Sequence, residues 1–134
     1  MKTPLLTIFS LACVCQAQAA WSLTDGNSLM QGVKTLRRVE AHENLTADET
    51  VVASKTAAYL RGFLDSSTAW SKVEQNSLFK LPEHGITVAE FLPAIEKFLT
   101  KSADKPQVLE LPAGGLLLAV LVEYFPNPAL KKRD

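Results

Sequence analysis

The sequence predicts an all-α fold of about four helices, packed as one compact domain. Two capping boxes each precede an apolar stretch with helical spacing, and a later stretch is apolar nearly all round. No strand-like alternation of useful length is present. The chain has 134 residues, which suits a single domain.

The first 19 residues resemble an export signal that is removed. Lys2 gives a positive start, residues 5–14 form an apolar run, and a small-x-small cleavage site ends at Ala19. The run is too short to span a bilayer, which needs about 20 residues. We therefore expect a periplasmic domain of residues 20–134 with no membrane contact. A lipoprotein anchored at Cys13 is the alternative. Because Cys13 and Cys15 leave with the signal, the mature domain has no disulfide and no cysteine metal ligand.

The first two helices are expected at residues 27–39 and 46–74, and the longer one organises the fold. Thr46 and Glu49 form its capping box. Arg61 and Asp65 lie on its wet side, four residues apart and close enough to pair. Its expected apolar face alternates in steps of four and three, at Val52, Thr56, Tyr59, Phe63, Ser66, Trp70 and Val73, and is widened by Ala53, Ala57, Leu60 and Leu64. We expect Phe63 to be buried against the last helix.

The second half of the chain predicts two more helices and two loops. A turn at residues 83–85 precedes a helix that begins with the Thr87 and Glu90 capping box, runs to residue 101 and contains Pro93. Residues 102–110 form a polar connection. Pro112 is expected at the first position of the last helix, where its missing N–H costs least. Residues 114–115, both glycine, suggest close approach of another backbone.

The composition favours no catalytic or nucleic-acid function. The 14 basic and 14 acidic residues balance, and no clustered basic surface is evident. His42 and His84 fall in different loops without metal-ligand spacing, and no glycine-rich phosphate loop occurs. A solvated face is the favoured interpretation of Glu83, Glu90 and Glu96, although hydrolysis by carboxylates that meet in space is another possibility. We expect no enzyme activity, no cofactor and no metal.

Four short pieces of the chain resemble motifs of the type VI secretion amidase immunity proteins (Rap/Tai type). Residues 25–30 resemble the family's G-N-x-L-L opening, and residues 59–65 resemble its G-Y-I-x-G-V-x-D run. Residues 81–87 resemble C-L-P-x-G-V-T with one inserted residue, and residues 123–126 resemble the A-x-x-x-A-F-P-C close. Together the pieces span nearly all of the mature chain in the family's order.

The resemblance implies a small exported helical protein that protects a bacterium from a cell-wall amidase delivered by its neighbours. It implies a homodimer whose exposed loops occlude the amidase's substrate cleft. The candidate contact residues are those of two loops: Glu83, His84, Gly85, Asp104, Lys105 and Glu110. The sequence departs from the family at its cysteine positions, which are Val33, Lys80 and Asn127 here. That departure puts the family's disulfides, and its usual partner, in question for this chain.

The leading hypothesis is thus a periplasmic immunity protein that binds a peptidoglycan amidase toxin by occlusion. The alternative is a small periplasmic chaperone-like or stress protein that binds unfolded clients. A chaperone should expose apolar surface when acidified, whereas an immunity protein should hold one tight partner at neutral pH.

Overall fold

The computed structural model describes residues 21–130. The export signal, its cleavage site at Ala19 and the alternative lipid anchor at Cys13 lie outside the described residues. The described chain forms five helices: α1 (Gly26–Glu40), α2 (Ala47–Val73), α3 (Val88–Lys101), α4 (Pro106–Leu109) and α5 (Ala113–Tyr124). Within residues 21–130 only two isolated β-bridges occur, and no strand forms. The all-α prediction is therefore confirmed.

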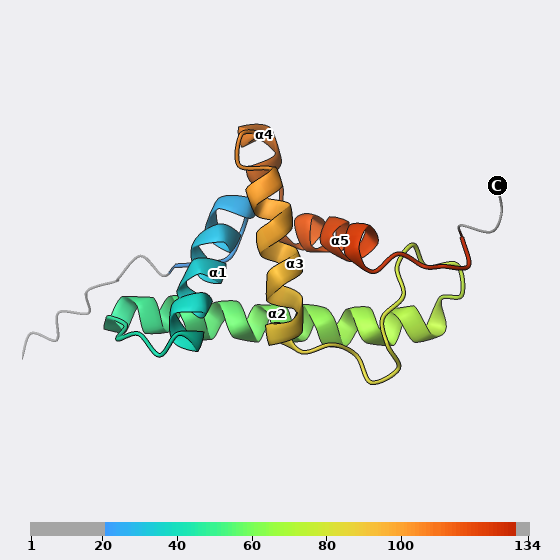
Figure 1. Cartoon of the computed structure of the whole chain (residues 1–134), viewed down its shortest axis with the longest axis horizontal. Coiled ribbons are helices and arrows are strands. Elements are labelled where there is room, and N and C mark those ends of the chain that lie inside the picture. The colour runs from blue at the N-terminus through green and yellow to red at the C-terminus, as the bar shows by residue number, and fades with distance from the viewer. Residues whose placement is uncertain (1–20, 131–134) are drawn as a thin grey trace, which may run out of the picture.

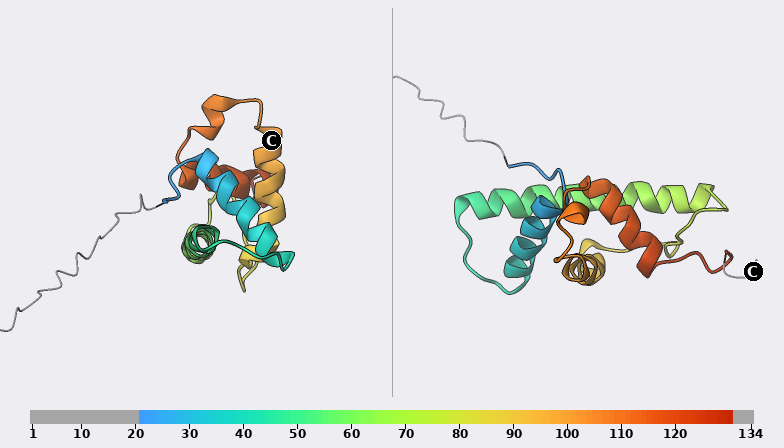
Figure 2. Two further views of the ribbon diagram at one scale, coloured as in Figure 1. Left: turned by 90° about the vertical axis from the view of Figure 1, so that its left-hand side faces the viewer. Right: turned by 90° about the horizontal axis from the view of Figure 1, so that it is seen from above.

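The long helix α2 is the base on which the other helices are arranged (Figure 1). Helices α1 and α3 stand across α2, and α5 lies beside α3 with α4 at the far end of α3. Viewed along α2, the other helices lie on one side of it (Figure 2, left). The one-turn helix α4 lies inside residues 102–110, which the sequence analysis expected only as a polar connection, so this fifth helix was not predicted.

Both predicted capping boxes are present. The Glu49 carboxylate accepts a hydrogen bond from the Thr46 N–H at 2.8 Å, and the Thr46 hydroxyl accepts one from the Glu49 N–H at 3.2 Å. Thr87 and Glu90 repeat the arrangement at the start of α3, at 2.7 and 3.2 Å. In each box the backbone N–H of the threonine lowers the pKa of the glutamate, because it stabilises the charged form. Helix α3 continues through Pro93.

Helices α1 and α2 cross at a point of very close approach. Gly32 of α1 faces Thr56 of α2, and a Cβ added to Gly32 would lie 2.2 Å from the Thr56 hydroxyl oxygen. Thr56 is fully buried, and its hydroxyl donates a 2.7 Å hydrogen bond to the Val52 carbonyl of the preceding turn. A residue without a side chain at position 32 therefore lets α1 settle onto α2.

The core is formed by one continuous cluster to which all five helices contribute. Its fully buried members include Leu60 of α2, Phe91 and Ile95 of α3, and Leu117 of α5. Leu109 brings the short α4 into the same cluster. Burial of each such large side chain contributes about 1.5–3 kcal/mol relative to leaving it exposed.

The core-facing side of α2 differs from the predicted one in its second half. The buried residues are Val52, Ala53, Thr56, Leu60, Leu64 and Ser67. Trp70 and Val73 are 55% and 80% exposed, so their predicted burial is wrong. Phe63 is half-buried and stacks on Phe91 of α3, with ring centroids 6.4 Å apart. Phe63 is therefore less buried than expected, although it does lie next to α5, because it lines a hollow together with Leu118 of that helix.

Two pairs of backbone hydrogen bonds connect segments that are distant in the sequence, and each such pair is called a clasp below. At the first, the Gly26 N–H donates to the Leu111 carbonyl and the Ala113 N–H donates to the Thr24 carbonyl. Pro112 is the N-cap residue of α5, one position before the helix begins, and not its first residue as predicted. A Cβ on Gly114 would approach the Tyr59 hydroxyl, which is a side chain, so the predicted close approach of a backbone is wrong.

The second clasp contains two of the positions where the resembled family has cysteines. The Lys80 N–H donates to the Phe125 carbonyl at 2.9 Å, and the Asn127 N–H donates to the Leu78 carbonyl at 3.1 Å. The buried Asn127 side chain donates a further 2.8 Å hydrogen bond to the Ser77 carbonyl. Hydrogen bonds therefore connect the end of α5 to the segment after α2 in this thiol-free region.

Candidate interaction surfaces

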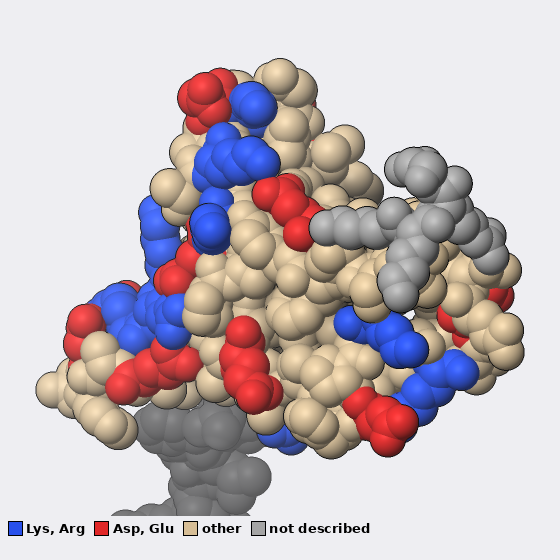
Figure 3. All heavy atoms as spheres, turned by 45° about the vertical axis from the view of Figure 1, so that its right-hand side comes forward, with Lys and Arg blue, Asp and Glu red and all other residues tan. Residues whose placement is uncertain are grey.

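The charged side chains of the described residues form no cluster suited to a metal ion. Between Trp21 and Leu130, no group of three or more His, Asp or Glu side chains is placed to hold a metal ion. On the face shown in Figure 3, basic and acidic side chains are interspersed, and neither sign gathers into one patch.

The first candidate surface is the turn of residues 82–85, which lies in the segment between α2 and α3. The Gly85 N–H donates a 2.8 Å hydrogen bond to the Pro82 carbonyl and closes the turn. Gly85 has φ +74° and is buried, and an added Cβ would lie 3.1 Å from the Thr68 hydroxyl of α2. Glu83 and His84 are exposed at its tip. The hydrogen bond thus fixes the backbone of the turn, and Glu83 and His84 are exposed on it. Gly85 packs against α2 on the inner side of the turn.

The second candidate surface is the short helix α4 and its flanks. Asp104, Lys105 and Glu110 are exposed there. The segment is anchored by Leu109, whose side chain is buried and whose carbonyl accepts a 3.4 Å hydrogen bond from the Asn27 side chain. This end of the molecule is therefore a structured projection and not a free loop.

The structure does not bring the two predicted sets of contact residues together. Glu83, His84 and Gly85 precede the N-terminus of α3, whereas Asp104, Lys105 and Glu110 follow its C-terminus (Figure 1). Helix α3 has 14 residues and is therefore about 21 Å long. One narrow cleft on a partner can accept one of these ends, but not both.

Residues of α2 form a shallow hollow beside the turn, which the sequence analysis did not identify. The hollow has a volume of about 420 Å³ and includes Arg61, Asp65, Ile86 and Ala89 in its lining. The predicted Arg61–Asp65 pair is absent: among the described residues, neither side chain forms an ion pair or a hydrogen bond. Helical spacing had placed both residues on the wet side of α2, but it could not show that the start of α3 lies next to them.

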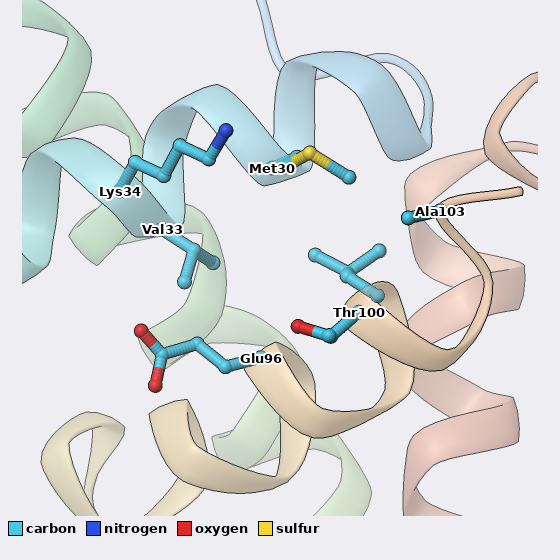
Figure 4. Close-up of a pocket in the computed structure, with 7 residues that line it drawn as sticks. Met30, Val33, Lys34, Glu96, Thr100 and Ala103 are labelled. Atoms are coloured by element: carbon cyan, nitrogen blue, oxygen red, sulfur yellow. The ribbon is translucent and has the colours of Figure 1, made fainter.

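A second hollow of about 420 Å³ lies between α1 and α3 (Figure 4). Met30, Val33 and Leu99 give it an apolar lining, and Lys34 and Glu96 lie at its edge. The Glu96 carboxylate is already engaged, because Arg37 donates to both of its oxygens at 2.9 and 2.7 Å. This ion pair connects α1 to α3 and raises the pKa of Arg37, which therefore stays charged.

Exposed apolar side chains form the third candidate surface. A hollow of about 310 Å³ between α2 and α5 is lined by residues that include Phe63, Trp70 and Leu118. Trp70 and Leu118 are 55% and 46% exposed. Helical periodicity singled out Trp70 but predicted that it lies in the core. The sequence therefore contained the signal for this surface, and the signal was interpreted as burial.

None of the helices within residues 21–130 is both long enough and apolar enough to cross a membrane. No family model matches the chain, and neither a curated protein nor a solved structure matches it.

Proposed function

We propose that the protein is a periplasmic immunity protein that binds a cell-wall amidase effector of a type VI secretion system and occludes its substrate cleft. The observation that carries this proposal is the order of the four family-like pieces along the chain. Residues 25–30 cap and begin α1, and residues 59–65 form the middle of α2. Residues 81–87 form the turn into α3, and residues 123–126 close α5. Each piece therefore falls at a point that defines the fold, which supports the resemblance.

The turn of residues 82–85 is the first candidate for the occluding segment, because it lies within the family-like piece of residues 81–87, whereas the α4 end lies outside all four pieces. A binding segment that is already ordered loses little conformational entropy on association. The turn is held by its own hydrogen bond and by contact with Thr68, and it presents one acidic side chain, Glu83, beside His84. The α4 end, with Asp104, Lys105 and Glu110, is the second candidate for the contact.

A binding experiment with matched variants tests the function and the site together. The purified protein is titrated against amidase effectors from the same genome, and peptidoglycan hydrolysis is measured in parallel. We expect one effector to bind tightly and to be inhibited. The Glu83→Lys/His84→Ala variant should lose at least about tenfold in affinity, which corresponds to 1.4 kcal/mol. The Asp104→Lys/Glu110→Lys variant should bind as the wild type does.

The outcomes of this experiment are distinct. Loss of affinity in the Asp104→Lys/Glu110→Lys variant alone would move the contact to the α4 end. Failure of the wild type to bind any amidase effector would reject the immunity function itself. All four substituted residues are exposed, so their replacement should leave the fold intact.

Binding of unfolded clients is the second candidate function, because one observation favours it. Trp70, Val73 and Leu78 expose 55%, 80% and 62% of their surfaces near one end of α2. Apolar surface of this kind is what a client-binding protein presents. Suppression of aggregation of an acid-unfolded model protein, together with increased binding of an apolar dye at low pH, would support this function over immunity.

A further inference from the structure

The hollow between α1 and α3 has the form of a small-molecule site (Figure 4). Its volume of about 420 Å³ lies within the range of ligand pockets, roughly 300–1,000 Å³. Val33 of α1 and Leu99 of α3 line it and are buried members of the core, so the hollow reaches the apolar interior. Met30 and Ala103 add further apolar surface. An alkyl chain placed there would be withdrawn from water, which favours binding.

The two walls of the hollow are held in place by the fold itself. Arg37 of α1 donates two hydrogen bonds to the Glu96 carboxylate of α3, at 2.9 and 2.7 Å. Val33 and Leu99 belong to the same core cluster. Because the spacing of α1 and α3 is fixed in this way, a ligand need not order the protein when it binds.

The charges at the edge of this hollow favour an anion. The Glu96 carboxylate is paired with Arg37, which also pairs with Glu40. Lys34 is exposed and forms no ion pair with any residue between 21 and 130. Its ammonium group is therefore available to an anionic ligand. The negative charge of Glu96 at the same edge disfavours a ligand with more than one negative charge.

A hydroxyl group on the α3 wall is also available. The hydroxyls of Thr35, Thr56 and Thr68 each donate to the carbonyl four residues earlier in their helix. The Thr100 hydroxyl forms no such bond in the described part of the chain, and its oxygen is turned toward the hollow (Figure 4). Thr100 can therefore donate a hydrogen bond to a ligand.

We propose that this hollow binds an aliphatic monocarboxylate of medium chain length, that is, a small fatty acid. Its carboxylate would pair with Lys34 and accept a hydrogen bond from Thr100, and its alkyl chain would lie on the apolar wall. The stretch from Glu96 to Ala103 is about 10 Å long, which suits an extended chain of about eight carbons. The proposal does not depend on amidase binding, because the turn of residues 82–85 precedes the opposite end of α3.

The methyl group of Met30 provides a reporter inside the hollow. Met1 and Met30 are the two methionines of the chain, so ¹³C-methyl-methionine labelling gives a simple spectrum, and a Met30→Leu variant assigns the resonance. Titration with octanoate should shift this resonance to saturation, with a dissociation constant below about 1 mM. Hexanoate should bind at least about tenfold more weakly, because each buried methylene changes the affinity about fourfold. Acetate, which lacks the chain, and octylammonium, which has the opposite charge, should cause no shift at the same concentrations.

Matched variants separate the site from the fold. Lys34→Glu should weaken octanoate binding at least about tenfold, because it places a second acid at the edge. Ala103→Phe should abolish binding by filling one end of the hollow. Lys72→Glu, a reversal of an exposed charge on α2, is the control and should bind octanoate as the wild type does. All three positions are exposed, so the variants should keep the far-UV circular dichroism spectrum of the wild type.

Four outcomes would overturn the proposal. The first is the absence of a saturable shift with octanoate, and the second is equal binding of octylammonium. The third is an unchanged affinity in Lys34→Glu. The fourth is binding that is lost in Trp70→Ala and kept in Ala103→Phe, which would place octanoate in the hollow between α2 and α5. Binding of N-acetylleucine in place of octanoate would likewise reject a fatty acid and assign the hollow to the end of a peptide chain.

Discussion

Substitution of Gly32 by alanine should destabilise the protein, although the same change inside a helix ordinarily stabilises by about 0.5–1 kcal/mol. The new Cβ would lie 2.2 Å from the Thr56 hydroxyl oxygen and 2.8 Å from its methyl carbon. Thr56 cannot rotate away without losing its 2.7 Å hydrogen bond to the Val52 carbonyl in a fully buried position. Helix α1 must therefore shift away from α2, and overpacking of this kind costs about 1–3 kcal/mol.

Gly62 provides the matched control, because it also lies in the middle of a helix but faces open space. Gly62→Ala should stabilise by about 0.5–1 kcal/mol. Urea unfolding followed by far-UV circular dichroism measures both variants, and their midpoints should move in opposite directions from the wild type. If Gly32→Ala raised the midpoint as Gly62→Ala does, the close crossing of α1 and α2 would be refuted.

A double-mutant cycle assigns the cost to the named contact. Thr56→Ala removes the two atoms nearest to the added Cβ and leaves the Thr56 Cβ at 3.1 Å. The Gly32→Ala change should therefore be at least about 0.5 kcal/mol less damaging in the Thr56→Ala background than in the wild type. Strict additivity of the two substitutions would place the strain elsewhere.

Three further predictions concern packing, the second clasp and pH. Phe91→Ala should lower the free energy of unfolding by about 3–5 kcal/mol, because Phe91 is fully buried. Phe63→Ala should lower it by only about 1–2 kcal/mol, because Phe63 is half-buried. Equal losses in urea unfolding would contradict the difference in burial. Asn127→Ala should cost about 1–3 kcal/mol, since it leaves the buried Ser77 carbonyl without its donor; an unchanged melting temperature would show that water replaces the bond. The pKa of Glu90 is lower in the folded state, so its contribution is present above about pH 4.3 and lost as the pH falls through the folded pKa. Glu90→Gln should therefore lower stability at pH 7 and converge with the wild type at low pH in pH-resolved melts.

Local signals in the sequence predicted where α2 and α3 begin. The Thr46 and Thr87 capping boxes require only residues three positions apart, and both are present in the structure. The turn at Gly85 was equally local, because glycine readily adopts the positive φ found there. These features did not depend on how the helices pack.

Features that depend on several elements were not predictable in the same way. Helix α4 is one turn long and has no side-chain cap, so propensity alone could not identify it within a polar stretch. It forms where Leu109 enters the core and where Gly26 leaves room for the α4 backbone. The hollow beside the turn combines Arg61 of α2 with Ile86 before α3, which are 25 positions apart in the sequence.

The side of α2 that faces the core is set by packing against the other helices, which the sequence of α2 does not contain. Two overlapping apolar stripes run along this helix, one with Leu60 and Leu64 and one with Tyr59, Phe63 and Trp70. At the crossing with α1, the backbone of Gly32 comes so close to α2 that only a small side chain, Thr56, fits between the helices. Thr56 lies close to both stripes, and the residues buried beyond it are Leu60 and Leu64.

The same packing leaves Tyr59 and Trp70 exposed to solvent. Their exposed surface adds nothing to the burial on which the fold depends. Large aromatic side chains that stay exposed after the core is complete are typical of surfaces that bind another protein. The part of α2 that the helical pattern assigned to the core is therefore a candidate surface for binding another protein.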